Sequence, residues 1–202
     1  EGSLARCRGL IHSLEESSLD GLSEITPAYV SLLVEFSNSD KIAGQSAKLD
    51  DILLSARALP ASEVPLREIG VCYDGPDLEE LARRNRLSVS DIIELHTLPV
   101  YSVFLIGFAP GFPYLGPLDP RLHAARLDTP RARVPAGSVA IGGEHTGIYS
   151  VASPVGWWLI GRTDSEMFSV SKARGSGSKE AFFLRQGDRV KFQPVSALLN
   201  SK

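Results

Sequence analysis

Residues that could carry chemistry gather in the turns of the second half of the chain. Arg131 lies between a Thr-Pro pair and a Pro-Ala-Gly turn, which hold it more rigidly than an ordinary surface arginine. A guanidinium in such a place can bind a carboxylate or a phosphate through two parallel hydrogen bonds. Glu144 and His145 stand in a glycine-bounded turn, where a carboxylate or an imidazole can transfer protons. We therefore predict Arg131, Glu144 and His145 as catalytic residues.

Plainer interpretations exist for the same two segments. The run Gly-Gly-Glu-His-Thr-Gly at 142–147 can be a simple hairpin turn, and the sequence alone does not decide between the two. The segment 121–133 is basic, with four arginines against one aspartate. In that segment we expect Arg121 and Arg126 to be solvated surface charges, in contrast to Arg131.

Aromatic residues and turn-forming residues supply the walls that a pocket would need. Residues 107–163 hold nine of the 18 glycines and seven of the 13 prolines of the chain. Glycine permits unusual backbone angles and proline fixes them, so this concentration indicates shaped loops on a β scaffold. A flexible linker would lack the aromatic residues found there. The predicted substrate-binding residues are Phe112, Pro113, Tyr114, Thr146 and Tyr149.

Signatures of several other chemistries are missing. The sequence contains no Gly-Lys-Ser/Thr phosphate loop, no Gly-x-Ser-x-Gly elbow, no His-Glu-x-x-His pair and no Cys-x-x-Cys. The four histidines have no spacing suited to helical metal ligands, so we expect no bound metal. The Gly-Ser repeat at 175–178 is too weak for a phosphate cradle, and we expect a polar, mobile loop over 173–179.

The composition is that of an ordinary globular protein. Hydrophobic residues make up 43% and charged residues 22% of the 202 residues, which suits one large domain or two small ones. The net charge of −3 gives no basic surface for nucleic acid, and no apolar run approaches the roughly 20 residues of a membrane helix. Cys7 and Cys72 stand in apolar patterns, which favours buried free thiols in a reducing cytosol. We expect a cytoplasmic protein without a secretion signal, whose N-terminus has been trimmed because the chain begins with Glu1.

The first 76 residues predict a small α+β domain. Apolar residues recur at helical spacing through 4–14 and again through 48–58. β-Branched and apolar runs predict strands over 22–25, 29–36 and 67–73, with the second of them central in its sheet. The first two strands are expected around a Thr-Pro-Ala turn.

A helical connector is predicted over residues 77–98. Two short helices are expected over 77–86 and 90–98, with Ser88 and Asp91 as a capping box. The pair resembles a helix-turn-helix, but a DNA reader presents Arg, Lys, Asn or Gln on its second helix, whereas this one presents Asp91 and Glu94. A structural helical pair is therefore the favoured interpretation.

From residue 99 to residue 202 the pattern is that of an all-β domain. Short runs of β-forming residues alternate with Gly and Pro turns, which predicts a closed antiparallel barrel. The candidate strands are 101–106, 138–141, 147–151, 157–162 and 189–193.

Several motifs of the chain occur together, in the same order, in one known family. They lie at 107–116, 118–122, 129–131, 133–139, 146–149, 156–157 and 159–163, with further landmarks at 71–74 and 187–190. Through these motifs the sequence resembles the B-type subunit of 5-oxoprolinase, also described as allophanate hydrolase subunit 1 or the KipI-like histidine kinase inhibitors. The resemblance covers nearly the whole chain, and the length and order of the motifs make it specific.

This resemblance implies a small N-terminal α+β domain and an all-β, cyclophilin-like barrel. It also implies a component of an ATP-dependent enzyme that hydrolyses 5-oxo-L-proline to L-glutamate. The implied partners are a homologous C-type subunit, which is similar to allophanate hydrolase subunit 2, and an A-type subunit. Because the sequence has no nucleotide motif, ATP is expected to act through the partner subunits, and the isolated chain is expected to be inactive. The family also offers two alternatives, which are inhibition of a sporulation-type histidine kinase and a carboxyltransferase role in a urea carboxylase or allophanate hydrolase system.

The sequence departs from the family pattern at a few positions. Pro117 follows Gly116 where a second glycine is usual, Glu144 and His145 replace Gly-Gln, and Ser150 stands where proline is common. We also expect the first helix to lack the strand that normally precedes it. These differences leave the expected fold unchanged and bear on the substrate contacts at Glu144 and His145.

Overall fold

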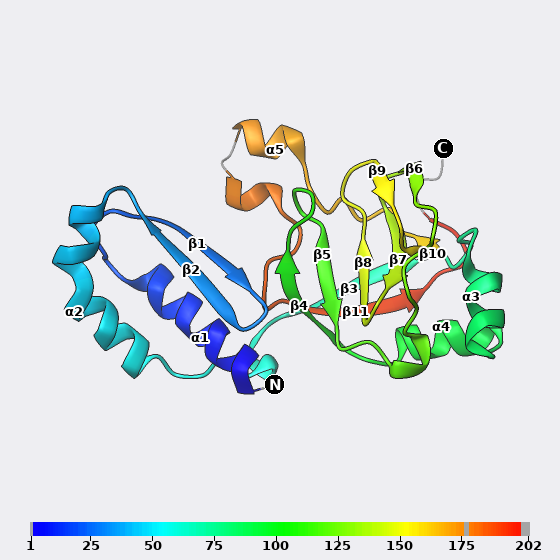
Figure 1. Ribbon diagram of the computed structural model, residues 1–202, viewed down its shortest axis with the longest axis horizontal. Coiled ribbons are helices and arrows are strands. Elements are labelled where there is room, and N and C mark those ends of the chain that lie inside the picture. Colours follow the sequence, from blue (N-terminus) through cyan, green and yellow to red (C-terminus); the bar gives the residue numbers. More distant parts are fainter. Residues whose placement is uncertain (1, 176–177, 199–202) are drawn as a thin grey trace. The chain divides into compact units, whose positions relative to one another are not determined.

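The computed structural model describes residues 2–175 and 178–198 (Figure 1). The chain divides into two compact units, Glu1–Val64 and Pro65–Lys202. This boundary precedes the one expected at residue 76. The reason is that strand β3 (Leu66–Val71), which the sequence pattern assigns to the first domain, pairs in parallel with β11 (Arg189–Pro194) and so belongs to the second unit.

Two helices and one hairpin form the first unit. Its elements are α1 (Gly2–Glu16), β1 (Leu22–Ala28), β2 (Ser31–Phe36), α2 (Ser39–Ser55) and the short 3-10 helix η1 (Ala61–Glu63). Helix α2 begins well before the predicted residue 48, because the Asn38 side chain caps it by accepting a hydrogen bond from the Lys41 N–H at 3.0 Å. The hairpin turn was predicted at Thr-Pro-Ala, but those residues belong to β1.

The turn of this hairpin follows Ala28 and contains Tyr29, whose φ of 51° is left-handed. Pro27 is tolerated inside β1 because that strand has a partner on one edge only. For the same reason β2 is not the central strand that its apolar sequence predicts, since β1 and β2 make a sheet of their own. Burial in this unit is concentrated on α1, through Cys7 and Leu14.

The second unit carries the remaining elements. They are β3, α3 (Leu78–Asn85), α4 (Val89–Thr97), β4 (Tyr101–Ile106), β5 (Pro113–Gly116), η2 (Pro120–Leu122), β6 (Arg131–Val134), β7 (Ser138–Gly142), β8 (His145–Ile148), β9 (Ser153–Val155), β10 (Trp158–Arg162), α5 (Val170–Gly175), η3 (Ser178–Ala181) and β11. The predicted strand at 101–106 has these same bounds, and the other four predicted strands coincide with β7, β8, β10 and β11 within a few residues.

A seven-stranded sheet in the order β10-β7-β8-β5-β4-β11-β3 makes the body of this unit. Its two edges meet where Cys72, just after β3, and Arg162 at the end of β10 exchange two backbone hydrogen bonds of 2.9 Å. The sheet is therefore nearly closed, and the predicted barrel is confirmed. It is not fully antiparallel, however, because β3 and β11 run parallel. Strands β6 and β9 form a separate two-stranded sheet.

The sequence pattern did not reveal β5, β6 and β9. Each has only three or four residues, and β5 begins with Pro113 and ends with Gly116. Strand β6 alternates charged and apolar residues and buries only Val134, and β9 contains Pro154. Short strands with Gly, Pro and Arg lack the β-forming composition on which sequence reasoning depends.

Helices α3 and α4 are part of the barrel unit and not a separate connector. Helix α3 contacts β10 and α4 contacts β11, and Figure 1 shows the pair against these strands. Leu81 and Ile92 are fully buried in the same core as the barrel strands. The predicted capping box is present, since the Ser88 hydroxyl accepts from the Asp91 N–H and the Asp91 carboxylate accepts from the Ser88 N–H.

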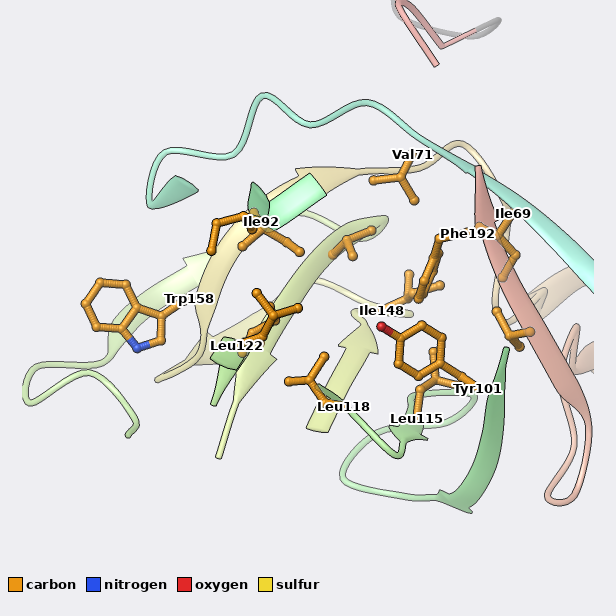
Figure 2. Packing of buried hydrophobic residues seen from close by; sticks show 14 of the residues in the cluster. Ile69, Val71, Ile92, Tyr101, Leu115, Leu118, Leu122, Ile148, Trp158 and Phe192 are labelled. Atoms are coloured by element: carbon orange, nitrogen blue, oxygen red, sulfur yellow. The ribbon is translucent and has the colours of Figure 1, made fainter. Parts of the chain in front are cut away.

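Apolar side chains from the helices and strands fill the interior of the barrel. Figure 2 shows Ile92 of α4, Tyr101 of β4 and Phe192 of β11 turned into the same interior. The part of the chain that the structure describes contains no helix long and apolar enough to span a membrane. Both cysteines are free thiols; Cys7 is buried and Cys72 is half-buried.

The polar loop expected over 173–179 is not found in the described residues of this stretch, which belong to two short helices. Residues up to Gly175 belong to α5, and η3 begins at Ser178. Residues 176–177, which were also expected to be mobile, lie outside the described part of the chain.

Candidate functional site

Three of the residues predicted to bind substrate come together in an aromatic cluster. Phe112 lies at its centre, with ring centroids 5.0 Å from Tyr114, 4.9 Å from Tyr149 and 5.5 Å from Trp157. All of these pairs are edge-to-face, which is the geometry that aromatic quadrupoles favour. Phe112, Tyr149 and Trp157 are almost fully buried, so the cluster is a small core of its own beside the barrel interior.

Local backbone features place each of these rings. Phe112 ends a tight turn in which its N–H donates to Ala109 O at 3.0 Å, and it passes directly into β5. Trp157 packs on Gly142 of β7, where a Cβ atom would lie 2.4 Å from the indole, so glycine is needed at this position. Phe108 completes the cluster from outside. It is 62% exposed and has a left-handed φ of 67°, and its ring is 5.5 Å from Phe112.

A cavity of about 170 Å³ opens among these rings. One charged side chain, Arg126, stands in its wall. Burial raises the pKa of Tyr149, as does the nearby Tyr114, while Arg126 acts to lower it, so Tyr149 keeps its proton at neutral pH. The lining residues are Phe108, Phe112, Tyr114, Arg126, Leu127, Pro130, Tyr149, Pro154, Gly156 and Trp157.

Thr146 was predicted to bind substrate, but it does not line this cavity. It is fully buried in the barrel, where its hydroxyl lies 2.8 Å from His96 Nε2 and donates to Ala140 O at 3.0 Å. His96 is also fully buried, and burial lowers its pKa to about 3. Pro113 is the first residue of β5 and is buried next to Phe112.

Arg131 binds a carboxylate, but the carboxylate is part of the protein. Its Nη2 donates to Asp77 Oδ1 at 2.5 Å, and Asp77 Oδ2 accepts the Leu159 N–H at 2.7 Å. The Asp77 side chain is 10% exposed and that of Arg131 is 34% exposed. The pair therefore joins β6 to the start of α3 and to β10, and a ligand role for Arg131 stays a prediction.

The Gly-Gly-Glu-His-Thr-Gly run forms the hairpin between β7 and β8. Gly142 pairs with His145, which leaves a two-residue loop whose first residue, Gly143, has a φ of 61°. Glu144 is exposed at the tip, and His145 is half-buried with its ring edge-on to Tyr114 at 6.2 Å. Burial lowers the pKa of His145, so its neutral form is favoured. Through this ring contact with Tyr114, His145 adjoins the aromatic cluster.

A second and larger cavity, of about 670 Å³, shares Tyr149 with the aromatic cavity as a lining residue. Its wall includes the Pro-Ala-Gly-Ser turn before β7 and the Gly-Arg-Thr end of β10. The Ser150 hydroxyl is buried there and has no hydrogen-bond partner among the residues that the structure describes. Arg162 and Asp74, which also line this cavity, form an ion pair of 2.8 Å. Among the described residues there is no group of His, Cys, Asp and Glu suited to hold a metal.

Comparison with known proteins agrees with the arrangement of the barrel and its loops. The family described as the carboxyltransferase domain, subdomain C and D, matches residues 1–176. Over 206 residues the chain is 38% identical to the protein of Bacillus subtilis (strain 168) that is named as the B-type subunit of 5-oxoprolinase, covering 93% of this chain and 83% of that protein. It is 46% identical over 128 residues to the protein of the same name from Haemophilus influenzae, covering 62% of this chain and 57% of that protein.

A solved structure shares the fold. The crystal structure of TTHA0988 superposes with a TM-score of 0.83 at 35% identity, over 98% of this chain and 38% of that chain. The fold and the matches define a carboxyltransferase-type domain, built from a small α+β unit and a nearly closed barrel. The chain belongs to the carboxyltransferase subdomain C and D family, together with the proteins named as the B-type subunit of 5-oxoprolinase.

Sequence reasoning missed three residues at or near the site. Arg126 was expected to be a solvated surface charge, and it borders the aromatic cavity. Phe108 gave a signal through its Gly-Phe-Ala-Pro-Gly-Phe motif, but its exposure could not be read from the sequence. His96 gave no signal, because its hydrogen-bond partner Thr146 is 50 residues away along the chain.

Proposed function

We propose that this chain is the B-type subunit of an ATP-dependent 5-oxoprolinase, which hydrolyses 5-oxo-L-proline to L-glutamate together with partner subunits. The observation that carries the proposal is the 38% identity with the Bacillus subtilis protein of that name over 83% of its length. The aromatic cavity adds support, because it is small and lined by several aromatic rings and therefore suits a compact ring.

The chemistry of the substrate explains why several subunits and ATP are needed. The ring amide of 5-oxoproline resists hydrolysis, and in this proposal ATP phosphorylates its carbonyl oxygen and leaves as ADP. Water then adds to the activated carbon, the ring C–N bond breaks with the nitrogen leaving as the amine, and hydrolysis of the resulting acyl phosphate gives glutamate and phosphate. The sequence has no phosphate-binding loop, so the partner subunits handle the nucleotide. The partners in this proposal are a homologous C-type subunit and an A-type subunit, and a cytoplasmic location fits a reaction that consumes ATP.

The residues of this chain hold the ring and keep water away from it. The edges and faces of Phe112, Tyr114 and Trp157 enclose a flat ring on several sides. His145 and Glu144 stay the predicted proton-transfer residues. Neutral His145 can accept a proton, and it stands next to Tyr114 and not in the cavity wall.

Reconstitution of the complex tests this function. The purified chain is mixed with its candidate A-type and C-type partners, ATP and 5-oxo-L-proline, and the release of glutamate is measured. We expect release only when all three proteins and ATP are present. The proposal fails if the complete mixture releases no glutamate, or if this chain alone is fully active.

The same preparation separates the two alternatives. ATP hydrolysis that depends on urea and not on 5-oxoproline would indicate a carboxyltransferase role. Inhibition of autophosphorylation of a copurifying histidine kinase, without any effect on 5-oxoproline consumption, would indicate a kinase inhibitor.

A further inference from the structure

Arg126 is the charged side chain that reaches the aromatic cavity. The other nine residues in the wall of this cavity are apolar, aromatic or glycine, and none is acidic. The cavity therefore presents one positive charge, and no negative one, to whatever enters it. An anionic group on the ligand is what such a wall would bind.

Two other arginines of the segment, Arg121 and Arg131, are engaged within the protein, whereas Arg126 is not. Arg121 pairs with Asp119 at 2.8 Å, and Arg131 pairs with Asp77. Across residues 2–175 and 178–198, Arg126 makes no ion pair. Its guanidinium keeps its planar set of donors available, which is the arrangement that binds a carboxylate through two hydrogen bonds.

The backbone on both sides of Arg126 is fixed. Ala124 exchanges two hydrogen bonds with Gly143 of the β7–β8 loop, and the Ala125 carbonyl accepts from the Trp158 indole N–H at 2.7 Å. The Leu127 N–H donates to Gly156 O, also at 2.7 Å. The Cα atom of Arg126 is thus held at the edge of the cavity while its side chain stays exposed, so little backbone entropy is lost when it binds a ligand.

From this geometry we infer that the aromatic cavity binds a small ring compound carrying one carboxylate, and that Arg126 pairs with the carboxylate. The cavity volume of about 170 Å³ is below the range of drug-sized sites, so the ring has to be small. The identity of the ligand as 5-oxo-L-proline rests on the proposed function, whereas the ligand class rests on the cavity itself.

Fluorescence of the wild-type chain provides the first test, because Trp157 is part of the cavity wall. The chain is titrated with 5-oxo-L-proline and, separately, with 2-pyrrolidinone, which has the same ring without the carboxylate. We expect a saturable change with 5-oxo-L-proline and an affinity for 2-pyrrolidinone that is lower by about tenfold or more. Equal affinities, or no saturable change with 5-oxo-L-proline, would overturn the inference.

Matched arginine variants provide the second test. Arg126→Gln should lower the affinity for 5-oxo-L-proline by about tenfold or more, leave that for 2-pyrrolidinone unchanged, and be partly rescued in Arg126→Lys. Arg121→Gln is the control, because this exposed arginine in the same segment pairs with Asp119 and does not line the cavity. An Arg126→Gln variant that is folded by circular dichroism and keeps the wild-type affinity would contradict the inference.

The reconstituted complex separates this inference from the proposed function. If the complex releases glutamate and Arg126→Gln leaves its KM unchanged, the function stands and the role of Arg126 is wrong. If the chain binds ring carboxylates through Arg126 but the complete complex releases no glutamate, the binding site stands and the proposed function is wrong. A raised KM in Arg126→Gln together with glutamate release supports both.

Discussion

His96 Nε2 lies 2.8 Å from the hydroxyl oxygen of Thr146, in the interior of the barrel. The Thr146 hydroxyl uses its one proton to donate to Ala140 O, so the histidine nitrogen has to be the donor in this contact. His96 Nδ1 is then an acceptor, and the Tyr73 hydroxyl donates to it at 2.7 Å. The result is a continuous chain of hydrogen bonds in which the hydroxyl and imidazole groups are all satisfied, and it ties α4 to β7 and β8.

Replacement of Thr146 by valine tests this chain, because valine keeps the shape and removes the hydroxyl. The His96 N–H and the Ala140 carbonyl would each lose a partner, so the free energy of unfolding should fall by about 2 kcal/mol. Thr146→Ser keeps the hydroxyl and loses one methyl group, which should cost about 1 kcal/mol. Urea denaturation measures both values, and equal losses in the two variants would argue against the hydrogen-bonded chain.

Acid should destabilise the barrel through His96. Burial lowers the pKa of His96 to about 3 from an ordinary value of 6.5, so between these values the unfolded chain binds a proton that the folded chain excludes. The stabilisation is fully present above pH 6.5 and is lost as the pH falls, at about 1.4 kcal/mol per pH unit. We expect urea denaturation to give a free energy of unfolding about 2 kcal/mol lower at pH 5 than at pH 7.

A His96→Gln variant serves as the control for this pH dependence. It removes the titrating group, so most of the difference between pH 5 and pH 7 should disappear, whatever its own stability. His145 acts in the same direction, because burial lowers its pKa too, and accounts for the part that persists. Asp119 has a pKa of about 2, so its protonation changes the free energy of unfolding only below pH 4, outside the range from pH 5 to pH 7. A full difference in His96→Gln would show that another group is responsible.

Loss of the Arg131 side chain should weaken the fold. In Arg131→Ala the nearly buried Asp77 carboxylate loses its cation, and we expect the free energy of unfolding to fall by about 2 kcal/mol. The Arg131 side chain is partly exposed, so this value is below that for a fully buried pair. In the double variant with Asp77→Asn, the two losses should be less than additive. Unchanged stability together with reduced turnover would contradict this structural role and would indicate that Arg131 binds a ligand.

Phe108 is expected to lower the stability of the fold through its backbone conformation and to contribute to ligand binding through its ring. Its left-handed backbone is strained for any residue except glycine, and its ring is mostly exposed. Phe108→Gly should therefore be more stable than Phe108→Ala by about 1 kcal/mol in thermal or urea denaturation. Both variants lack the ring at the cavity, so both should raise the KM for 5-oxo-L-proline in the complex. A Phe108→Ala variant as stable as Phe108→Gly would contradict the strain.

Gly142→Ala should disturb the aromatic cluster by displacing the Trp157 ring. The new methyl group would lie 2.4 Å from the Trp157 indole, so the ring has to move, at a cost of about 1–3 kcal/mol. A shift in Trp157 emission should accompany the loss of stability. Gly156→Ala is the matched control on the same cavity, because its nearest atoms would be 3.8 Å away, an ordinary contact distance. Equal effects of the two substitutions would show that crowding at Trp157 is not the cause.

Much of the fold could be predicted because its signals are local. The strand at 101–106 is a continuous run of β-forming residues, and the capping box at Ser88 and Asp91 needs only four consecutive positions. The Gly- and Pro-rich motifs were sufficient to indicate both the barrel and the family. Strands such as β6 and β9 escaped prediction, because three or four residues with Arg or Pro form a strand only when a neighbouring strand is present.

The sequence by itself determined the barrel, the aromatic loops and the family, since each depends on the order and spacing of nearby residues. Only the tertiary structure decided which arginine faces the cavity. The rigid surroundings of Arg131 made it the better candidate in the sequence. In the structure Arg131 pairs with Asp77, which is 54 residues away along the chain. Arg126, for which there was less reason in the sequence, lines the cavity instead. Electrostatic pairing depends on distances of a few ångströms in space, and spacing along the chain does not fix those distances.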